Sequence, residues 1–217
     1  MIQYTSTSTY RSPLGLIVIE SDGEALTGLR FADVKASASK MEHDEAGGEK
    51  VESNKVSSAI PIIAATIRLL DDYFSGKRTE NATMGKQPEN VTIGKQTENS
   101  TMGKQTDTLI VVKPRGTMFQ QRVWQALLTI PYGETVSYGE IARMVGCRSA
   151  QAVGQAVGAN PIAILIPCHR VIAANGKIGG YAYGEEKKKR LLACEQQSKH
   201  KKHQVGKANG NFLSNCF

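Results

Sequence analysis

The sequence predicts two domains, an α/β domain over residues 1–112 and a mainly α-helical domain over residues 113–198. Three observations support this division. Short apolar runs separated by turn residues stand near the N-terminus, and segments with helical periodicity dominate after Pro114. The net charge changes from −3 over residues 1–112 to +10 over residues 113–217. A chain of 217 residues is long enough for two such domains, each with its own core.

The first thirty residues are predicted to be β structure. Residues 16–19 are an apolar run, residues 21–23 are a turn signal, and residues 26–31 alternate afterwards, which together indicate a hairpin. Residues 35–58 are polar and lack periodicity, so a loop is expected there. A helix is predicted over residues 60–74, followed by Gly76 as its stop. Its apolar stripe consists of Ile63, Ile67, Leu70 and Phe74.

An internal repeat interrupts this pattern at about residues 79–105. Copies of a nine-residue unit start at Thr79, Pro88 and Thr97. The unit has little apolar surface to bury, which predicts a flexible surface insertion. Each copy contains an N-x-T triplet, and without a secretion signal these are interpreted as accidents of the repeat. The triplets begin at Asn81, Asn90 and Asn99.

Three helices are predicted in the second domain, over residues 119–129, 138–145 and 150–159. Ser137 and Ser149 are suited to cap the second and third helices, and Gly146 to end the second. Two short capped helices joined by a tight turn are a candidate helix-turn-helix.

The third predicted helix consists almost entirely of small residues. Glycine in a helix costs roughly 1 kcal/mol relative to alanine, so Gly154 and Gly158 need a compensating reason. One reason is the close approach of another surface, such as a DNA minor groove. Tight packing between helices inside the protein explains the glycines equally well.

An apolar, β-branched run at residues 162–166 predicts a buried strand that leads into Pro167 and Cys168. His169 and Arg170 follow, and their positive potential is expected to favour the thiolate of Cys168. A reactive cysteine is therefore predicted here. Cys147 and Cys194 are interpreted as small buried hydrophobic residues.

The residues 167–171, Pro-Cys-His-Arg-Val, resemble the active-site motif of the O6-alkylguanine-DNA alkyltransferases. The resemblance runs in order from about Pro114 to Glu195, with weaker likeness at residues 12–15 and 69–77. It is carried by residues 133–138, 152–154, 160–161, 175–176, 180–181, 188–192 and Glu195.

This resemblance implies a ribonuclease-H-like N-terminal domain and a winged helix-turn-helix C-terminal domain. It also implies that Cys168 accepts an alkyl group from O6-alkylguanine, or also from O4-alkylthymine, after the nucleotide has left the duplex. The product is a stable thioether, so each molecule is expected to act once. In the family a water bridges the cysteine to a histidine that matches His169, and a glutamate that matches Glu195 orients that histidine. Without the family, Glu195 would be interpreted as a solvated residue at a helix end.

Further roles follow from the same resemblance. Tyr138, which alone is equally consistent with a core aromatic residue, is expected to rotate the nucleotide and to donate to a ring nitrogen of guanine. Asn160 matches a hinge asparagine, Tyr181 a residue of the base pocket, and the Val171 carbonyl an acceptor for the guanine amino group. The residues expected at the DNA are Arg148, Gln151, Ala152, Gly154 and Arg170.

The chain departs from the family pattern at two positions. Gln151 stands where many members have an arginine that fills the gap left by the flipped base, so weaker DNA affinity is expected. Tyr183 stands where several members have glycine, and its ring is expected to narrow the range of alkyl groups accepted. The zinc ligands that some members carry in the N-terminal domain are not apparent.

The expected partner is double-stranded DNA that contains O6-alkylguanine, bound by a monomer without a cofactor or metal. No apolar run approaches the roughly 20 residues needed to span a bilayer, and no secretion signal is evident. The cytoplasm is therefore expected, or the nucleus in a eukaryote, with the cysteines reduced. Residues 199–217 are expected to form a flexible basic tail. The positive charge of the C-terminal half fits nucleic acid, but also a tail that serves solubility.

Two rival functions remain at this level. A non-catalytic binder of damaged DNA would flip the base without repairing it, and the presence of Cys168 argues against this class. A cysteine hydrolase that uses Cys168 and His169 would turn over, and a basic helix-turn-helix half has no place in its mechanism.

Overall fold

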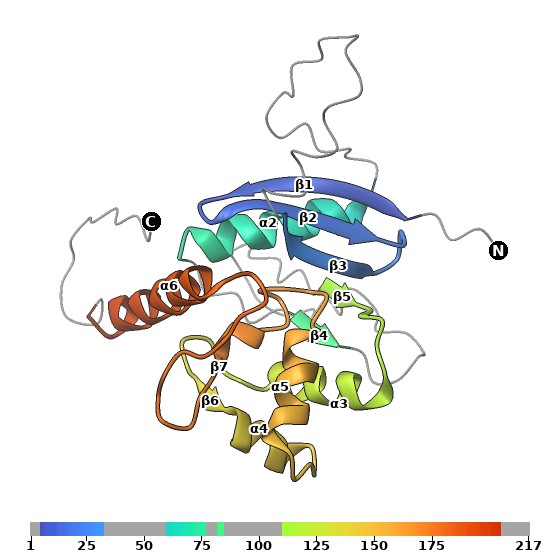
Figure 1. Ribbon diagram of the computed structural model, residues 1–217. Helices are drawn as coiled ribbons and strands as arrows, with labels where there is room; N and C mark the ends of the chain where they lie inside the picture. Colours follow the sequence, from blue (N-terminus) through green and yellow to red (C-terminus); the bar gives the residue numbers. More distant parts are fainter. Residues whose placement is uncertain (1–4, 33–59, 77–81, 85–109, 205–217) are drawn as a thin grey trace, which may run out of the picture.

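The computed structural model describes residues 5–32, 60–76, 82–84 and 110–204 (Figure 1). The predictions for residues 35–58, for the three N-x-T asparagines and for most of the nine-residue repeat lie outside these ranges. Within them, no helix is both long and apolar enough to cross a membrane.

The N-terminal domain is built on a five-stranded sheet with the order β1-β2-β3-β5-β4. The strands β1 (Ser6–Ser12), β2 (Gly15–Ser21) and β3 (Leu26–Phe31) pair antiparallel, which confirms the hairpin and adds an edge strand. The short strands β5 (Ile110–Val112) and β4 (Ala82–Met84) continue the sheet in parallel. Because β4 belongs to the first copy of the repeat, the prediction of a wholly flexible insertion is wrong for these residues.

Helix α2 (Pro61–Phe74) packs on this sheet and confirms the predicted helix (Figure 1). Pro61 occupies the first turn, where its missing N–H is not needed. Gly76 has a φ of 74°, which ends the helix in the left-handed region. The buried face is wider than the predicted stripe, since Leu69 and Tyr73 are buried while Ile67 is only partly so.

The C-terminal domain contains helices α3 (Met118–Leu127), α4 (Tyr138–Met144) and α5 (Ala150–Gly158). Ser137 and Ser149 cap α4 and α5 as predicted, each accepting a backbone N–H, and Ser137 forms a capping box with Glu140. Gly146, with a φ of 66°, ends α4. The indole of Trp124 donates to the carbonyl of Ala156 at 2.8 Å and so fixes α5 against α3.

A two-stranded parallel ladder, β6 (Val136–Ser137) with β7 (Val171–Ile172), lies beside these helices. The chain then passes through a loop into the helix α6 (Glu185–Gln204) (Figure 1). Since α6 runs beyond residue 199, the predicted flexible tail is helical as far as Gln204.

The predicted strand over residues 162–166 is wrong, although the whole segment is buried. The segment is a series of tight turns, with a hydrogen bond from Leu165 N to Ala163 O of 2.7 Å around Ile164. Ile164 has a φ of 67°, a region that β-branched residues rarely adopt. The Asn160 amide closes the turns by donating to Ile166 O at 2.8 Å and to Ile162 O at 3.2 Å.

The two domains share a continuous hydrophobic core. Leu29 of β3 donates to Pro161 O at 2.9 Å and accepts from Ala163 N at 2.7 Å, so the sheet is bonded to the turns that precede Cys168. The active-site segment therefore rests on the N-terminal domain.

Candidate active site

Cys168 begins the short 3₁₀ helix η1 (Cys168–Arg170), directly after Pro167. The residue is buried, with 5% of its surface exposed. The Asn160 amide donates to its sulfur at 3.1 Å. Asn160 stands at the end of α5, so the helix that carries the predicted DNA contacts is joined to the sulfur through one side chain.

Burial raises the pKa of the Cys168 thiol above its usual 9.0. The Asn160 amide, the backbone N–H groups of Cys168 and His169, and the positive charge of Lys188 lower it, but only in part. The predicted stabilisation of the thiolate by His169 and Arg170 is therefore wrong, because the nearby positive charge that acts on the sulfur is Lys188. The resting thiol needs a base to remove its proton.

His169 is the candidate for this base. Its Nε2 is 2.7 Å from Oε1 of Glu195, and both side chains are fully buried. Burial lowers the pKa of the imidazole below its usual 6.5 despite the nearby carboxylate. A neutral ring that donates from Nε2 to Glu195 keeps Nδ1 as a proton acceptor. Among the described residues no protein group bonds Nδ1.

Glu195 is the centre of a buried network, so the interpretation of a solvated helix-end residue is excluded. Arg170 contacts it with two nitrogens, Nε to Oε2 at 2.8 Å and Nη2 to Oε1 at 3.0 Å. The backbone N–H of Gly133 donates to Oε2 at 2.9 Å. Burial opposes ionisation, but the charges and hydrogen bonds of His169 and Arg170 outweigh it and hold the pKa of Glu195 well below its usual range.

Arg170 was expected at the DNA, and the structure places it inside the protein instead. It is 8% exposed, its Nη1 donates to Ile130 O at 2.8 Å, and its guanidinium lies 5.4 Å from the ring centroid of Tyr132. The guanidinium of Arg170 is paired with Glu195, so Arg170 stabilises the buried network of the active site.

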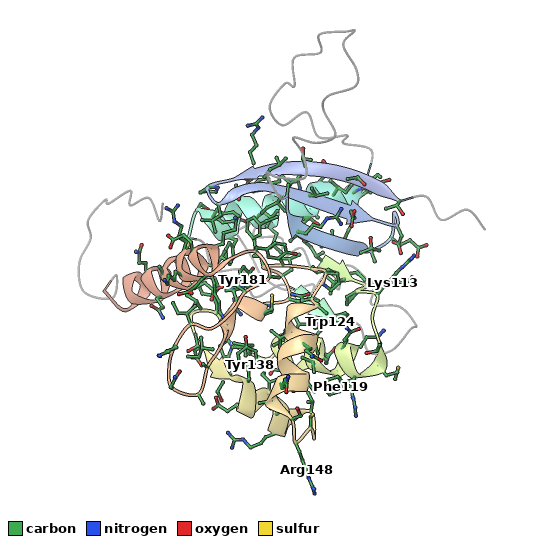
Figure 2. All side chains as sticks on the ribbon, viewed as in Figure 1. Lys113, Phe119, Trp124, Tyr138, Arg148 and Tyr181 are labelled. Carbon is green, nitrogen blue, oxygen red and sulfur yellow. The ribbon has the colours of Figure 1, made fainter. Side chains whose placement is uncertain are left out.

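Two tyrosines are near enough to interact with Cys168, namely Tyr138 at the start of α4 and Tyr181 in the loop before α6. Both are labelled in Figure 2. Burial first, and then the neighbouring Cys168, raise the pKa of both hydroxyl groups. Both are therefore phenols at neutral pH and able to donate a hydrogen bond. The Tyr138 ring lies between Gly154 and Gly179, where an added β-carbon would stand 3.8 Å and 3.9 Å from it.

Tyr183 extends this aromatic group toward the N-terminal domain. Its ring meets that of Tyr181 edge-on at 5.5 Å and that of Phe31 of β3 at 5.3 Å. The proposed effect on the range of alkyl groups stays a prediction.

The remaining predicted DNA contacts lie on the outer face of α5 and its preceding turn. Gln151 and Arg148 are exposed, and Ala152 and Gly154 are partly exposed. Arg148 points to solvent at the tip of the domain (Figure 2). The structure thus separates a buried reaction centre from an exposed helix.

Lys188 is a functional candidate that the sequence analysis missed. It is fully buried, and its Nζ donates to Val171 O at 2.6 Å and to Gly180 O at 3.1 Å. Residues 188–192 were counted in the family resemblance, but no role was assigned to Lys188. The signal that could have identified it is spacing, because Lys188, Leu191 and Glu195 lie on one face of a helix at i, i+3 and i+7.

Tyr73 of α2 was also missed. Its hydroxyl donates to Oε1 of Glu195 at 2.9 Å, from a position 122 residues away in the chain. No local pattern marks such a contact.

A cavity of about 270 Å³ lies behind this network, between α2 and the segments that precede Cys168. Tyr73, Pro167 and Arg170 line it, whereas Cys168, Tyr138 and Tyr181 do not. The cavity is therefore separate from the face on which a substrate would meet the sulfur. In the described part of the chain, no group of three or more histidine, cysteine or acidic side chains is arranged to hold a metal ion.

Comparison with known proteins matches both halves of the chain to one family. Residues 6–83 match "6-O-methylguanine DNA methyltransferase, ribonuclease-like domain", and residues 118–197 match the DNA binding domain of the same family. The methylated-DNA–protein-cysteine methyltransferase of Mycobacterium leprae is 39% identical over 195 residues, 89% of this chain and 90% of that protein. The protein of that name from Methanosarcina acetivorans is 36% identical over 187 residues, 86% and 95% of the two chains.

Solved structures are similar to this chain as well. The O6-methylguanine methyltransferase of Mycobacterium tuberculosis superposes with a TM-score of 0.59 at 34% identity, covering 90% of this chain and 94% of that one. Mycobacterium tuberculosis OGT in complex with DNA gives a TM-score of 0.59 at 36% identity, with coverages of 88% and 92%.

Proposed function

The chain belongs to the 6-O-methylguanine DNA methyltransferase family, and we propose that Cys168 is the residue that receives the alkyl group from the O6 position of guanine. The family activity, transfer of a methyl group from methylated DNA to a protein cysteine, is the activity of this chain, which binds DNA and repairs it directly. The observation that carries the assignment to Cys168 is its position: a buried thiol bonded to Asn160 and adjacent to the His169–Glu195 pair.

The reaction is a displacement at the alkyl carbon. The sulfur of Cys168 forms a bond to that carbon while the bond from carbon to guanine O6 breaks, and its electron pair passes to the base. The thiol proton passes to Nδ1 of His169 through a water, and Glu195 stabilises the imidazolium that results. Lys188 and the Asn160 amide stabilise negative charge on the sulfur before the new bond forms.

The leaving base also needs a proton donor. The Tyr138 hydroxyl donates to a ring nitrogen of guanine, which disperses the charge arriving from O6. The Val171 carbonyl accepts from the guanine amino group, and Tyr181 lines the base pocket. Since the product is a thioether and nothing in the site cleaves it, one protein molecule repairs one base.

The target base must leave the duplex to reach a sulfur that is 5% exposed. The exposed face of α5, with Gln151, Ala152 and Gly154, approaches the DNA, and Arg148 contacts a phosphate. Gly158 of α5 supports this arrangement, because an alanine β-carbon there would meet nothing within 4 Å, so internal packing does not explain this glycine.

At the level of fold, the N-terminal domain is of ribonuclease-H-like topology and the C-terminal domain is a winged helix-turn-helix. The capped pair α4 and α5 with a turn at Gly146 supports the helix-turn-helix. The β6–β7 ladder and the loop that follows it support the wing.

Mass spectrometry tests the assignment after incubation with a duplex that carries one O6-methylguanine. The expected result is a gain of one methyl group per protein molecule, localised to the peptide of Cys168 and abolished in Cys168→Ala. The buried cysteine Cys194 provides the matched control, since Cys194→Ala should still accept one methyl group. Binding without a gain in mass would instead identify a non-catalytic damage binder, and repeated turnover on an ester would identify a hydrolase.

A further inference from the structure

The carboxylate of Glu195 is the group of the reaction centre that a side chain of the N-terminal domain contacts. Tyr73 projects from α2, is 2% exposed, and donates its hydroxyl to Oε1 at 2.9 Å. The same oxygen is 2.7 Å from Nε2 of His169 and 3.0 Å from Nη2 of Arg170. Tyr73 thus acts on the oxygen that orients the histidine.

Three donors share one carboxylate oxygen, which offers two lone pairs. Each donor withdraws negative charge from that oxygen, and each hydrogen bond weakens the hold of Glu195 on the proton at Nε2 of His169. The Tyr73 hydroxyl stays protonated, because burial and then the charge of Glu195 raise its pKa well above the usual value. It therefore donates throughout the pH range in which His169 titrates.

We propose that Tyr73 is a positioning residue for alkyl transfer, through which the N-terminal domain sets the basicity of the His169–Glu195 pair. This inference rests on the proposed function of Cys168 and His169. Without the phenol hydroxyl, Glu195 concentrates more negative charge toward His169 and favours the imidazolium. The pKa of His169 then rises. As the pH is lowered, the neutral imidazole is therefore protonated at a higher pH than in the unmodified protein.

Other charged and titratable groups face this pair from each surrounding element. They remain in place when only the hydroxyl of Tyr73 is removed. They are Arg170 and Cys168 of η1, Lys188 of α6, Tyr132 before β6 and Tyr181 of the loop before α6.

The Tyr73→Phe variant of the full chain removes one oxygen atom and leaves the ring contacts with Phe74 at 5.2 Å and with Tyr132 at 6.0 Å. The matched control is Tyr10→Phe. Tyr10 donates to the carboxylate of Asp71 at 2.8 Å, a bond of the same chemistry within the N-terminal domain. Both variants lose a tyrosine–carboxylate hydrogen bond, but only one of these bonds reaches the reaction centre.

The measurement is the single-turnover rate of methyl transfer from an O6-methylguanine duplex as a function of pH, together with the NMR titration of the His169 ring. In Tyr73→Phe, the acid limb of the rate profile and the His169 titration should both move up by about 0.5 to 1 pH unit. On the acid limb, the rate of Tyr73→Phe should be roughly three- to tenfold below that of the unmodified protein at the same pH. On the plateau, the two rates should differ by less than about twofold. Tyr10→Phe should leave both curves in place.

An unmoved limb and titration in Tyr73→Phe, or an equal movement in Tyr10→Phe, would overturn the positioning role. Absence of methyl transfer by the unmodified protein would overturn the proposed function itself, and with it the kinetic role of Tyr73. The two failures are therefore distinguishable in one experiment.

Discussion

At the scale of single residues, Lys188 shows how a charge can serve the reaction without contacting solvent. Its Nζ donates to the carbonyl of Val171 in β7 and to the carbonyl of Gly180 in the loop before α6. Burial lowers the pKa of the ammonium, while the nearby Cys168 and Glu185 oppose that effect. The ammonium and the thiolate stabilise one another.

We expect Lys188→Met to slow alkyl transfer at neutral pH about tenfold, because loss of the ammonium raises the pKa of Cys168. The buried carbonyl of Val171 also loses its donor, which costs about 1 to 3 kcal/mol of stability. The control is Lys189→Met, which removes a half-exposed lysine paired with Glu185. Rates of Cys168 alkylation against pH check this, and equal rates in the two variants would contradict it.

Gln151 is an exposed, neutral residue on the face of α5 that is proposed to approach DNA. A neutral amide at this exposed position can hydrogen-bond to the base left unpaired but carries no charge. Gln151→Arg is expected to tighten binding to damaged duplex by about 1 kcal/mol, roughly fivefold, since hydrogen bonds from charged donors are stronger. Fluorescence anisotropy measures this. Gln155→Arg, one turn along the same exposed face, controls for added charge, and equal tightening in both variants would refute a specific role for position 151.

At the scale of elements, the helices of the C-terminal domain follow from local signals. Ser137 and Ser149 cap α4 and α5 where the pattern predicted, because capping depends on residues within one turn. The same kind of local reasoning wrongly predicted a strand over residues 162–166. Their β-branched composition favours a strand, but the Asn160 side chain and the bonds to Leu29 fold them into turns. Periodicity carries no information about such contacts.

The composition of α5 leads to a prediction about Gly154. Gly154→Ala should stabilise the folded protein by up to about 1 kcal/mol, because alanine favours a helix and its methyl group would stand 3.8 Å from the Tyr138 ring. The same methyl group lies on the face proposed to approach DNA, so affinity for a duplex should fall severalfold. Urea denaturation and anisotropy measure the two effects. A stabilised variant with unchanged DNA affinity would show that this glycine does not serve the approach to DNA.

At the scale of the whole molecule, one buried charge network joins the two domains, so stability should depend on pH. The folded state lowers the pKa of His169 below its unfolded value of 6.5, so the unfolded chain binds more protons as the pH falls below 6.5. Glu195 likewise has a lowered pKa, and its contribution is lost as the pH falls through its unfolded value of 4.5 and below. Both effects act in the same direction.

We therefore expect the free energy of unfolding to be highest above about pH 6.5 and to fall as the pH is lowered from there toward about pH 4. Urea unfolding across this range measures it. The His169→Gln variant should lose the part of the dependence that lies between the lowered pKa of His169 and 6.5. A stability that stays constant on acidification would contradict the burial of this pair.

The sequence by itself determined the two-domain division and the capped helices, and it singled out Cys168 as the cysteine proposed to react, with His169 and Glu195 as its partners by resemblance. These features depend on periodicity, on capping residues within one turn, and on a motif that is contiguous around Cys168. Only the tertiary structure decided that Arg170 lies inside, that Lys188 supplies the charge near the sulfur, and that Tyr73 reaches Glu195. Those roles depend on contacts between segments far apart in the chain, and burial decides whether a charged side chain meets solvent or a partner.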